Sequence, residues 1–330
     1  MTSKTDTFRA HVLHEPDTSS RELLESLVDP NVVLTYGDAM PAEPPELLVA
    51  GRPEPRHLDA APGLRFLLIP WAGLPVATAE TMRAYPHVAV HNSHHNACSA
   101  AELAFALALA AAKQLIPGDR ELRRGDWSPR YEQGGIVRLD GARALILGYG
   151  AIGRSIAGFC RAFGMQVTGV RRGPGAGGGP DEVVGLDSLD SALAKADFLF
   201  VTLPLTPETE GLLDERRLGL LPPRAVLVNV GRGPVIDEEA LYRALTSGTL
   251  GAAGLDVWYN YPRDRDSRGA TPPSDFDFGA LDNVVLSPHR GGAPGTDRTE
   301  RERMEAVASS INAAARGESV PNPVDLVAGY

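Results

Sequence analysis

Cysteine is scarce in this chain. Among 330 residues there are two, Cys98 and Cys160. Two cysteines cannot form a disulfide framework or a thiolate metal centre, and their number fits a reducing compartment. We therefore expect a cytoplasmic protein whose fold does not depend on disulfides.

Long uninterrupted hydrophobic runs are also missing. The most apolar segment, AAELAFALALAAAKQLI (100–116), is rich in alanine and contains Glu102 and Lys113. A helix that spans a bilayer needs about 20 predominantly apolar residues. The start of the chain lacks the apolar core of a signal peptide. We expect a buried helix at 100–116 and no contact with a membrane.

The chain carries no excess of positive charge. Lysine and arginine total 32 against 42 aspartates and glutamates, which gives a net charge of −10. This balance argues against a general nucleic-acid-binding surface. The length suits two domains better than one core.

What the first third of the chain does contain is an alternation of short apolar runs with helix-like pieces. Each run is β-branched or leucine-rich, has the length of a strand and closes at a turn residue. A helix that Ser99 would cap, with Glu102 at its third position, follows these runs. The predicted strands are 31–37, 46–51, 65–70 and 87–92, and the predicted helix is 99–116.

A polar connector at 117–135 leads to a second series of strands and helices. This spacing predicts right-handed crossovers, a parallel sheet and an α/β fold. Two segments break the rhythm, the glycine-rich 171–182 and the polar insertion 261–279, and lids and disordered loops are equally good interpretations of both. The predicted strands are 142–148, 165–170, 197–203, 225–230, 251–258 and 283–288, and the clearest helices are 152–163, 187–195 and 237–246.

The stretch LILGYGAIGRSIAGFC places Gly148, Gly150 and Gly153 between an apolar strand and an amphipathic helix. This is the context in which G-x-G-x-x-G binds a dinucleotide. Gly148 permits the turn, Gly150 lets the backbone approach the pyrophosphate, and Gly153 lets helix and strand pack closely. The N–H groups at the start of the helix then face the anion. The competing interpretation is a glycine-rich turn without a ligand.

The end of the next strand distinguishes between cofactors. NAD sites usually carry an acidic residue there for the ribose 2′-hydroxyl, whereas this chain has Arg171 and Arg172. A guanidinium binds a 2′-phosphate through charge-assisted hydrogen bonds. We predict a preference for NADP(H), with NAD(H) as the alternative if both arginines point to solvent.

Six stretches of the chain together resemble the D-isomer-specific 2-hydroxyacid dehydrogenases, a family that includes phosphoglycerate, glycerate, D-lactate and formate dehydrogenases. They are NACSAAELAFALALAAAK, LILGYGAIGRSIAGFCRAFGM, LPLTPETEGLL, LVNVGRGPVIDEEAL, GAAGLDVW and NVVLSPHRGG. The resemblance implies a Rossmann-type doubly wound sheet over 101–289, which binds the dinucleotide. It is inserted into a smaller flavodoxin-like α/β domain, made of 1–100 and 290–330, which binds the substrate. The resemblance also implies a homodimer formed through the dinucleotide-binding domains.

The resemblance places the family's catalytic arginine on Arg232 and its catalytic histidine on His289. A planar guanidinium can bind a substrate carboxylate and polarise the neighbouring carbonyl. An imidazole can give a proton to the ketone oxygen as the hydride arrives. These roles predict hydride transfer between NADP(H) and a small 2-oxo or 2-hydroxy acid.

The family's catalytic glutamate, 29 positions after its arginine, falls on Tyr261 in this chain. A neutral phenol can hydrogen-bond the imidazole but cannot stabilise its protonated form by charge. We expect His289 to titrate low and ketone reduction to favour acidic pH. Two alternatives remain open, a formate-like or phosphite-like hydride donor that has no alcohol proton to remove, and a nucleotide-sensing protein without catalysis.

The remaining candidates also follow the resemblance. His94 and His95 could suggest a metal, but adjacent side chains seldom point together and no third ligand is apparent, so we expect no metal and a possible anion contact from His95. Asp256 is expected to receive the nicotinamide carboxamide. The substrate candidates are Asn96, Trp71, Ala72, Gly73 and His95, and the further cofactor candidates are Tyr149, Ala151, Ile152, Pro204, Thr209, Val230, Asp256 and Gly292.

Overall fold

The computed structural model describes residues 7–132, 134–172, 182–293, 295–326 and 329. It divides into two compact units, Met1–Asn96 with Ala293–Tyr330, and Ala97–Gly292. The second unit is therefore inserted into the sequence of the first. The chain passes between the units a few residues from the boundaries expected at 100 and 289, and the ligands assigned to the two units remain predictions.

In the first unit, the described residues form a five-stranded parallel sheet in the order β2-β1-β3-β4-β5. This is the strand order of flavodoxin-like folds, as expected. Its strands are β1 (Phe8–Val12), β2 (Val32–Tyr36), β3 (Leu47–Val49), β4 (Phe66–Leu68) and β5 (Ala89–His91).

Strand β1 escaped the sequence analysis because its five residues, FRAHV, include Arg9 and His11. The His11 side chain is nonetheless fully buried. Its two ring nitrogens form hydrogen bonds of 2.8 Å with the Thr35 hydroxyl and the Gly37 carbonyl. A buried polar ring needs such partners. Because both ring nitrogens of His11 are bonded, the strand can bury this polar side chain.

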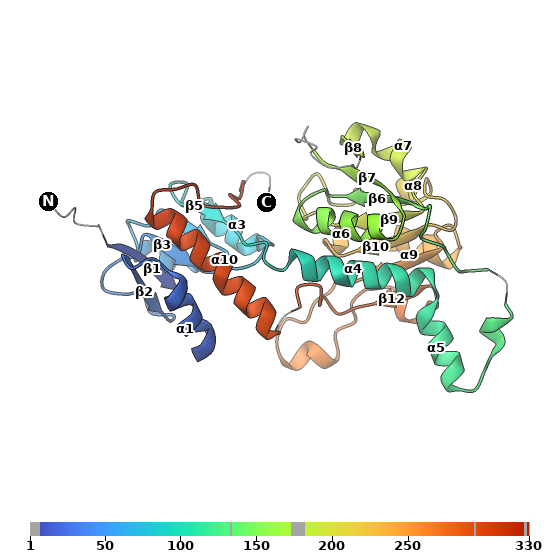
Figure 1. Ribbon diagram of the computed structural model, residues 1–330, viewed down its shortest axis with the longest axis horizontal. Coiled ribbons are helices and arrows are strands. Elements are labelled where there is room, and N and C mark those ends of the chain that lie inside the picture. The colour runs from blue at the N-terminus through green and yellow to red at the C-terminus, as the bar shows by residue number, and fades with distance from the viewer. Residues whose placement is uncertain (1–6, 133, 173–181, 294, 327–328, 330) are drawn as a thin grey trace. The chain divides into compact units, whose positions relative to one another are not determined.

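Successive residues of these strands point to opposite faces of the sheet. Leu47 and Val49 face the cluster that contains Leu24 of α1 and Met304 of α10, whereas Leu48 packs with the cluster on the other face. Figure 1 shows α1 and α10, from the two ends of the chain, lying together on the sheet. The helices of this unit are α1 (Thr18–Leu27), α2 (Pro55–Asp59), α3 (Val76–Met82) and α10 (Asp297–Ala315).

In the second unit, the described residues form a seven-stranded parallel sheet in the order β12-β11-β10-β9-β6-β7-β8. Read from β8, this is the strand order of a Rossmann-type sheet, with its change of direction beside β6. The expected doubly wound fold is confirmed. The strands are β6 (Arg143–Leu147), β7 (Gln166–Val170), β8 (Glu182–Val184), β9 (Phe198–Val201), β10 (Val226–Asn229), β11 (Ala252–Leu255) and β12 (Val284–Leu286).

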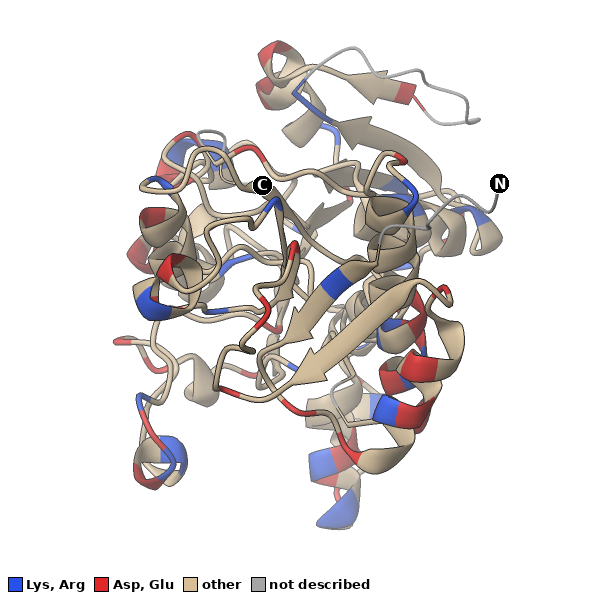
Figure 2. Ribbon diagram, turned by 90° about the vertical axis from the view of Figure 1, so that its left-hand side faces the viewer, with Lys and Arg blue, Asp and Glu red and all other residues tan. Residues whose placement is uncertain are grey.

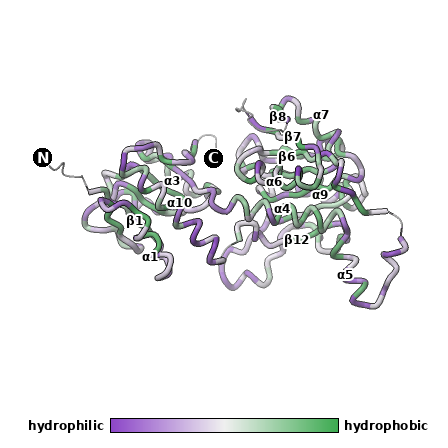
Figure 3. Tube along the Cα trace, viewed as in Figure 1, coloured by the Kyte–Doolittle hydropathy of each residue, from purple (hydrophilic) through white to green (hydrophobic). Residues whose placement is uncertain are grey.

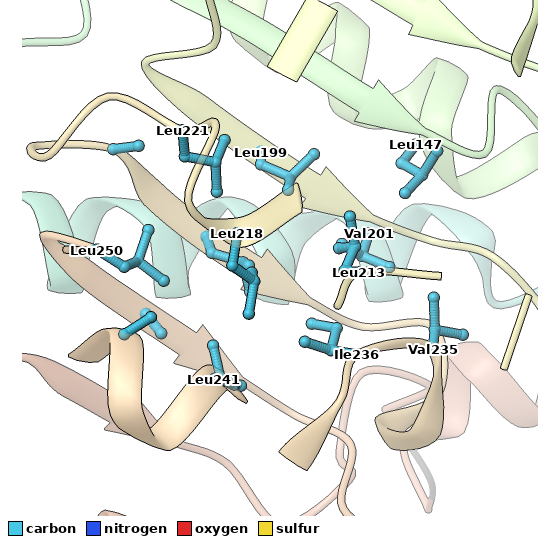
Figure 4. Packing of buried hydrophobic residues seen from close by; sticks show 14 of the residues in the cluster. Leu147, Leu199, Val201, Leu213, Leu218, Leu221, Val235, Ile236, Leu241 and Leu250 are labelled. Atoms are coloured by element: carbon cyan, nitrogen blue, oxygen red, sulfur yellow. The ribbon is translucent and has the colours of Figure 1, made fainter. Parts of the chain in front are cut away.

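Helices cover both faces of this sheet. One face packs against α4 (Ala97–Ala112) and α6 (Ala151–Ala162), and Figure 3 colours much of α4 as hydrophobic. The other face packs against three further helices, through a leucine-rich cluster that Figure 4 shows from close by. These are α7 (Leu189–Leu193), α8 (Glu215–Leu218) and α9 (Glu238–Thr246).

The helix expected over 99–116 was wrong at both ends. The helix α4 begins at Ala97, so Ser99 lies inside it and does not cap it. The chain then breaks at Gln114, which has a φ of 51°, and α5 (Leu115–Arg123) begins at the next residue. Pro117 explains the break, because proline clashes with the carbonyl four residues earlier and is tolerated only in a helix's first turn.

The C-terminal part of the polar insertion 261–279 is bonded to the rest of the second unit. The Glu238 carboxylate accepts hydrogen bonds from the Ser274 hydroxyl and the Asp275 N–H, and Phe278 is buried. The glycine-rich segment 171–182 lies almost wholly outside the described residues. Short 3-10 helices occur at Ser128–Arg130, Leu186–Ser188, Gly233–Val235, Asp266–Gly269 and Phe278–Ala280.

Acidic and basic side chains are interleaved along the surface helices (Figure 2). Ion pairs four residues apart join Arg21 to Glu25 and Arg298 to Glu302. Within the described residues no single helix is long and apolar enough to cross a membrane, although the bent pair α4–α5 passes that test by length and composition.

Candidate active site

The candidate residues of the second unit gather at one edge of its sheet. Because all its strands are parallel, their carboxyl ends meet at the same edge, where α/β sheets bind ligands. Gly148 follows β6, Arg171 follows β7 and Arg232 lies just beyond β10. Asp256 follows β11, and His289 lies just beyond β12. Topology therefore brings together residues that are more than a hundred positions apart.

The glycines of the G-x-G-x-x-G motif have three different surroundings. Gly148 has a φ of 105°, which favours glycine. A Cβ atom at Gly153 would lie 2.2 Å from the Gly148 carbonyl oxygen, whereas one at Gly150 would meet nothing within 4 Å. The protein's own packing therefore does not require Gly150 to be glycine. Open space beside the first turn of α6 fits the close approach of a pyrophosphate.

Arg171 and Arg172 lie at the end of β7, and both side chains are exposed. The Arg171 N–H donates to the Val184 carbonyl, which holds the backbone at the sheet edge. A nitrogen of the Arg172 guanidinium lies 3.7 Å from the Glu208 carboxylate. Both residues therefore follow β7, the strand that pairs with β6, which leads into the Gly148–Gly153 turn.

The Arg232 loop is held by a buried side chain that the sequence analysis missed. Asn229 is 1% exposed; its amide oxygen accepts from the Gly231 N–H and its amide nitrogen donates to the Arg232 carbonyl, both at 3.0 Å. The Arg232 guanidinium donates to the Gly231 carbonyl at 2.7 Å. A polar residue at the end of the otherwise apolar strand VLVN was the available signal. Asn229 fixes the backbone from which the guanidinium projects.

The turn that carries His289 is anchored by Asp256, which is 1% exposed. Its carboxylate accepts from the Arg290 N–H at 2.7 Å, from the Gly291 N–H at 2.8 Å and from the Ser287 hydroxyl. His289 itself has a φ of 55°, in the left-handed region that few residues other than glycine adopt and in which histidine, asparagine and aspartate are the commonest of those. The buried carboxylate therefore holds the turn that carries the imidazole in this left-handed conformation.

Tyr261 and His289 form a hydrogen-bonded pair. The Tyr261 hydroxyl lies 2.9 Å from Nδ1 of His289, and the ring centroids are 5.6 Å apart. The Trp258 N–H donates to the same hydroxyl oxygen at 3.2 Å. The Trp258 indole donates to the Ser287 carbonyl at 2.8 Å. Trp258 is therefore bonded both to Tyr261 and to the segment that leads to His289.

The pair keeps solvent-accessible surface, but the atoms packed around it remove enough water to shift both pKa values. Burial lowers the pKa of the His289 imidazole, Arg232 lowers it further, and Asp256 opposes the change. Burial raises the pKa of the Tyr261 phenol, while the Trp258 N–H and Arg232 oppose the rise. Both rings are therefore neutral at neutral pH, and Arg232 and Asp256 are the charges that act on them.

The other cofactor candidates lie along the same edge. The Thr209 hydroxyl donates to the Pro204 carbonyl at 2.7 Å and so closes the loop after β9. Val230 is buried at the end of β10, and the Tyr149 ring lies against Gly169. Thr202, which the sequence analysis missed, donates from its hydroxyl to the Gly148 carbonyl at 2.6 Å. The remaining candidates, Ala151 and Ile152, open α6, and Gly292 ends the second unit.

The substrate candidates lie in the first unit, at the carboxyl edge of its own sheet. The Trp71 indole occupies the space where a Cβ at Gly51 would stand. The Asn92 amide donates to the Ala72 carbonyl at 2.7 Å, and the Trp71 carbonyl accepts from the Ser93 N–H. Both carbonyls therefore bond to the segment that follows β5. Ala72 and Gly73 are half-buried. Asn92 anchors the loop and was not expected from the sequence.

Asn96 is half-buried at the end of this unit. His95 Nδ1 lies 3.0 Å from the Ser93 hydroxyl, and burial followed by Arg303 lowers the pKa of the His95 imidazole. Within the described residues, no group of three histidine, cysteine, aspartate or glutamate side chains could hold a metal ion.

Comparison with known proteins gives the family. The model of the NAD binding domain of D-isomer specific 2-hydroxyacid dehydrogenases matches residues 105–291. The chain belongs to this family. Among 2-hydroxyacid dehydrogenase relatives, it is 35% identical over 274 residues to the D-3-phosphoglycerate dehydrogenase of Mycobacterium tuberculosis. That match covers 82% of this chain and 49% of the relative, so the chain spans about half the length of that protein.

Other members are similar over nearly their full length. The chain is 31% identical over 332 residues to a glyoxylate reductase of Thermococcus onnurineus, covering 96% of this chain and 90% of that one. The crystal structure of a D-isomer specific 2-hydroxyacid dehydrogenase from Xanthobacter autotrophicus Py2, in complex with NADPH and MES, superposes with a TM-score of 0.78. The two chains are 25% identical, and the match covers 98% of this chain and all of that one.

Proposed function

We propose that the protein is a reductase that transfers a hydride from NADPH to a small 2-oxo acid. The observation that carries this proposal is the convergence of Arg232, Tyr261 and His289 at the sheet edge that also carries the glycine cradle. Family membership supports the same reaction class. We further propose that Ala97–Gly292 binds the nucleotide and that the other unit binds the substrate.

The reacting groups act through charge and hydrogen bonding. Burial lowers the pKa of the Arg232 guanidinium, but an arginine stays protonated at neutral pH. Its planar fork can bind the substrate carboxylate in two hydrogen bonds and polarise the adjacent C2 carbonyl. His289 presents its Nε2 atom, which accepts or donates no hydrogen bond within the described residues, for the carbonyl oxygen. Reduced nicotinamide, when bound, supplies the hydride and is oxidised by two electrons.

The proposed preference for NADPH over NADH rests on Arg171 and Arg172, which follow the strand next to the glycine cradle and which we expect to meet the ribose 2′-phosphate. The similar enzyme from Xanthobacter autotrophicus was crystallised with NADPH, which supports this preference. Gly150 and the first turn of α6 would hold the pyrophosphate, and Asp256 remains a candidate for the carboxamide through oxygen lone pairs that its turn does not use.

We also propose that Tyr261 stands where other family members carry a catalytic glutamate. Its 2.9 Å hydrogen bond to Nδ1 of His289 supports this placement. An uncharged neighbour of the histidine also suits a hydride donor without an alcohol proton, so formate or phosphite oxidation is the second candidate reaction.

For the substrate, the loop at 71–73 is proposed to receive the carboxylate through backbone N–H groups. Its carbonyls at Trp71 and Ala72 are already bonded to Ser93 and Asn92, so its N–H groups face the other way. Asn96 and His95 would contact the rest of the acid.

The reaction is tested by following NADPH and NADH oxidation with glyoxylate, hydroxypyruvate, pyruvate and phenylpyruvate. We expect turnover with at least one of these, and a kcat/KM for NADPH at least about 10-fold above that for NADH, because one charge-assisted contact contributes about 1.4 kcal/mol or more. No turnover alongside tight nucleotide binding would favour a nucleotide sensor. Reduction of NADP⁺ by formate or phosphite would favour the second candidate reaction.

The proposed homodimer is supported by a group of exposed apolar side chains on α5 and the segment after it, which extend away from the sheet of the second unit (Figure 1). Analytical ultracentrifugation is expected to show a dimer that Trp127→Glu with Ile116→Glu converts to monomer. The equally exposed Val76→Glu, in the first unit, is the control and should leave the dimer intact. A monomeric wild type would contradict the proposal. The exposed apolar residues are Leu115, Ile116, Leu122, Trp127, Tyr131 and Ile136.

A further inference from the structure

The hydroxyl of Tyr261 has a defined set of neighbours. Its oxygen accepts the Trp258 N–H at 3.2 Å and lies 2.9 Å from Nδ1 of His289. A phenol has one hydrogen to donate. Among the described residues, Nδ1 is the one acceptor within hydrogen-bonding distance of this hydroxyl.

This arrangement favours one tautomer of His289. If the Tyr261 hydroxyl donates to Nδ1, that nitrogen is an acceptor, and the neutral ring carries its hydrogen on Nε2. A carboxylate at position 261 would do the opposite, because it can only accept and would hold the hydrogen on Nδ1. The neutral His289 ring thus offers a donor, and no acceptor, to the substrate oxygen.

We propose that Tyr261 is the source of the proton in ketone reduction, with His289 as the relay between the phenol and the substrate. The substrate of this inference, a 2-oxo acid, rests on the proposed function. The hydrogen-bond geometry of Tyr261 and His289 does not depend on it. Tyr261 does not touch the substrate and acts through His289, as a residue that positions and reprotonates the imidazole.

The step balances in atoms and charge. As the hydride reaches C2, the carbonyl π bond breaks and its electron pair moves to the oxygen. The new O–H bond takes the Nε2 proton, Nδ1 takes the phenolic proton, and Tyr261 is left as phenolate. The ketone is reduced and the reduced nicotinamide is the reductant. A phenol is a stronger acid than an alcohol, so the net transfer from phenol to alkoxide is favourable.

The surroundings of Tyr261 suit a transient phenolate. The Trp258 N–H already points at its oxygen, and the charge of Arg232 stabilises the anion. Tyr261 is 45% exposed, so water can return the proton after each turnover. In the reverse direction the same site needs the phenolate before it can remove an alcohol proton, and oxidation should therefore rise about 10-fold per pH unit below the pKa of the phenol.

The pH dependence separates this relay from direct proton donation by an imidazolium. A general acid works below its pKa and fails above it. With the relay, kcat/KM for reduction stays level through the neutral range and falls only where the Tyr261 phenol ionises, at a pKa raised above 10.0. Without it, kcat/KM falls above the pKa of His289, which lies below its ordinary value of 6.5.

The test compares wild type with Tyr261→Phe, which keeps the ring and removes the hydroxyl. We expect the variant to lose about 30-fold in reduction at about pH 8 but only a few-fold near pH 5.5, where an imidazolium can still supply the proton. Tyr259→Phe is the control, because its hydroxyl donates to the Ile236 carbonyl at 3.0 Å and does not contact His289. It should keep the wild-type profile. The same pH profile for wild type and Tyr261→Phe would overturn the relay.

A second measurement does not depend on turnover. Nitrogen-15 NMR of the eight histidines, with His289 assigned by its loss in His289→Gln, reports which ring nitrogen carries hydrogen. We expect an unprotonated Nδ1 and a protonated Nε2 in wild type above the pKa of the ring, and the same in Tyr259→Phe. A protonated Nδ1 would overturn the relay. If no 2-oxo acid is turned over, the proposed function fails while this measurement still decides the hydrogen-bond geometry.

Discussion

Replacing Arg232 with lysine is expected to lower kcat/KM for reduction by about 10³-fold, because a lysine keeps the charge but loses the planar pair of donors. The guanidinium is largely enclosed and is fixed by its bond to the Gly231 carbonyl. A lysine ammonium in the same place is a compact point charge without a planar pair of donors. It cannot bind both carboxylate oxygens and polarise the carbonyl at the same time.

Steady-state kinetics over a range of acid concentrations checks this result. Arg224→Lys is the matched control, since Arg224 is an exposed arginine of the same unit and its replacement should leave kcat/KM within about two-fold. Near-normal turnover by Arg232→Lys would remove Arg232 from the mechanism. A loss confined to KM would assign it to substrate binding alone.

Replacing Asp256 with alanine is expected to lower kcat by about 10²-fold and the free energy of unfolding by about 3 kcal/mol. Three donors, the N–H groups of Arg290 and Gly291 and the Ser287 hydroxyl, would lose their acceptor at once. The His289 backbone, with its φ of 55°, would then relax and move the imidazole away from the substrate.

Denaturant unfolding and a fluorescence titration with NADPH test the cause of that loss. A turn that depends on Asp256 predicts a fall in kcat and stability with nucleotide affinity unchanged. A role confined to the nicotinamide carboxamide predicts weaker nucleotide binding with normal stability, and would contradict the anchoring role. Ser287→Ala removes one of the three bonds and should give a smaller loss of the same kind.

Much of the fold could be predicted because hydrophobic periodicity and turn residues locate parallel strands well. The central strands β9 and β10 of the second unit are buried on both faces, so FLFV is apolar throughout and VLVN is apolar up to its last residue. Strand β1 was missed for the opposite reason, since His11 is buried through tertiary hydrogen bonds that no local pattern reveals. The three-residue β8 is too short to give a pattern.

The candidate site could be predicted in its residue types but not in its hydrogen bonds. The resemblance to the 2-hydroxyacid dehydrogenases indicated Arg232, Tyr261 and His289 as the side chains to consider, and the structure brings Tyr261 and His289 into contact. The Trp258 N–H reaches the Tyr261 hydroxyl through the conformation of the single loop after β11. The anchoring of the His289 turn by Asp256 depends on how the loops after β11 and β12 fold together. Those loops begin 30 or more residues apart, so sequence alone cannot give their geometry.

The reacting side chains and the glycine cradle all belong to one continuous segment, Ala97–Gly292, while the candidate loop at 71–73 belongs to the other. On the proposed assignments, Asn96 and His95, which would contact the rest of the acid, therefore lie in a different stretch of the chain from the side chains that would react. On those assignments, we expect substitutions at Asn96 or His95 to change which acid is accepted while leaving the Tyr261–His289 hydrogen bond intact.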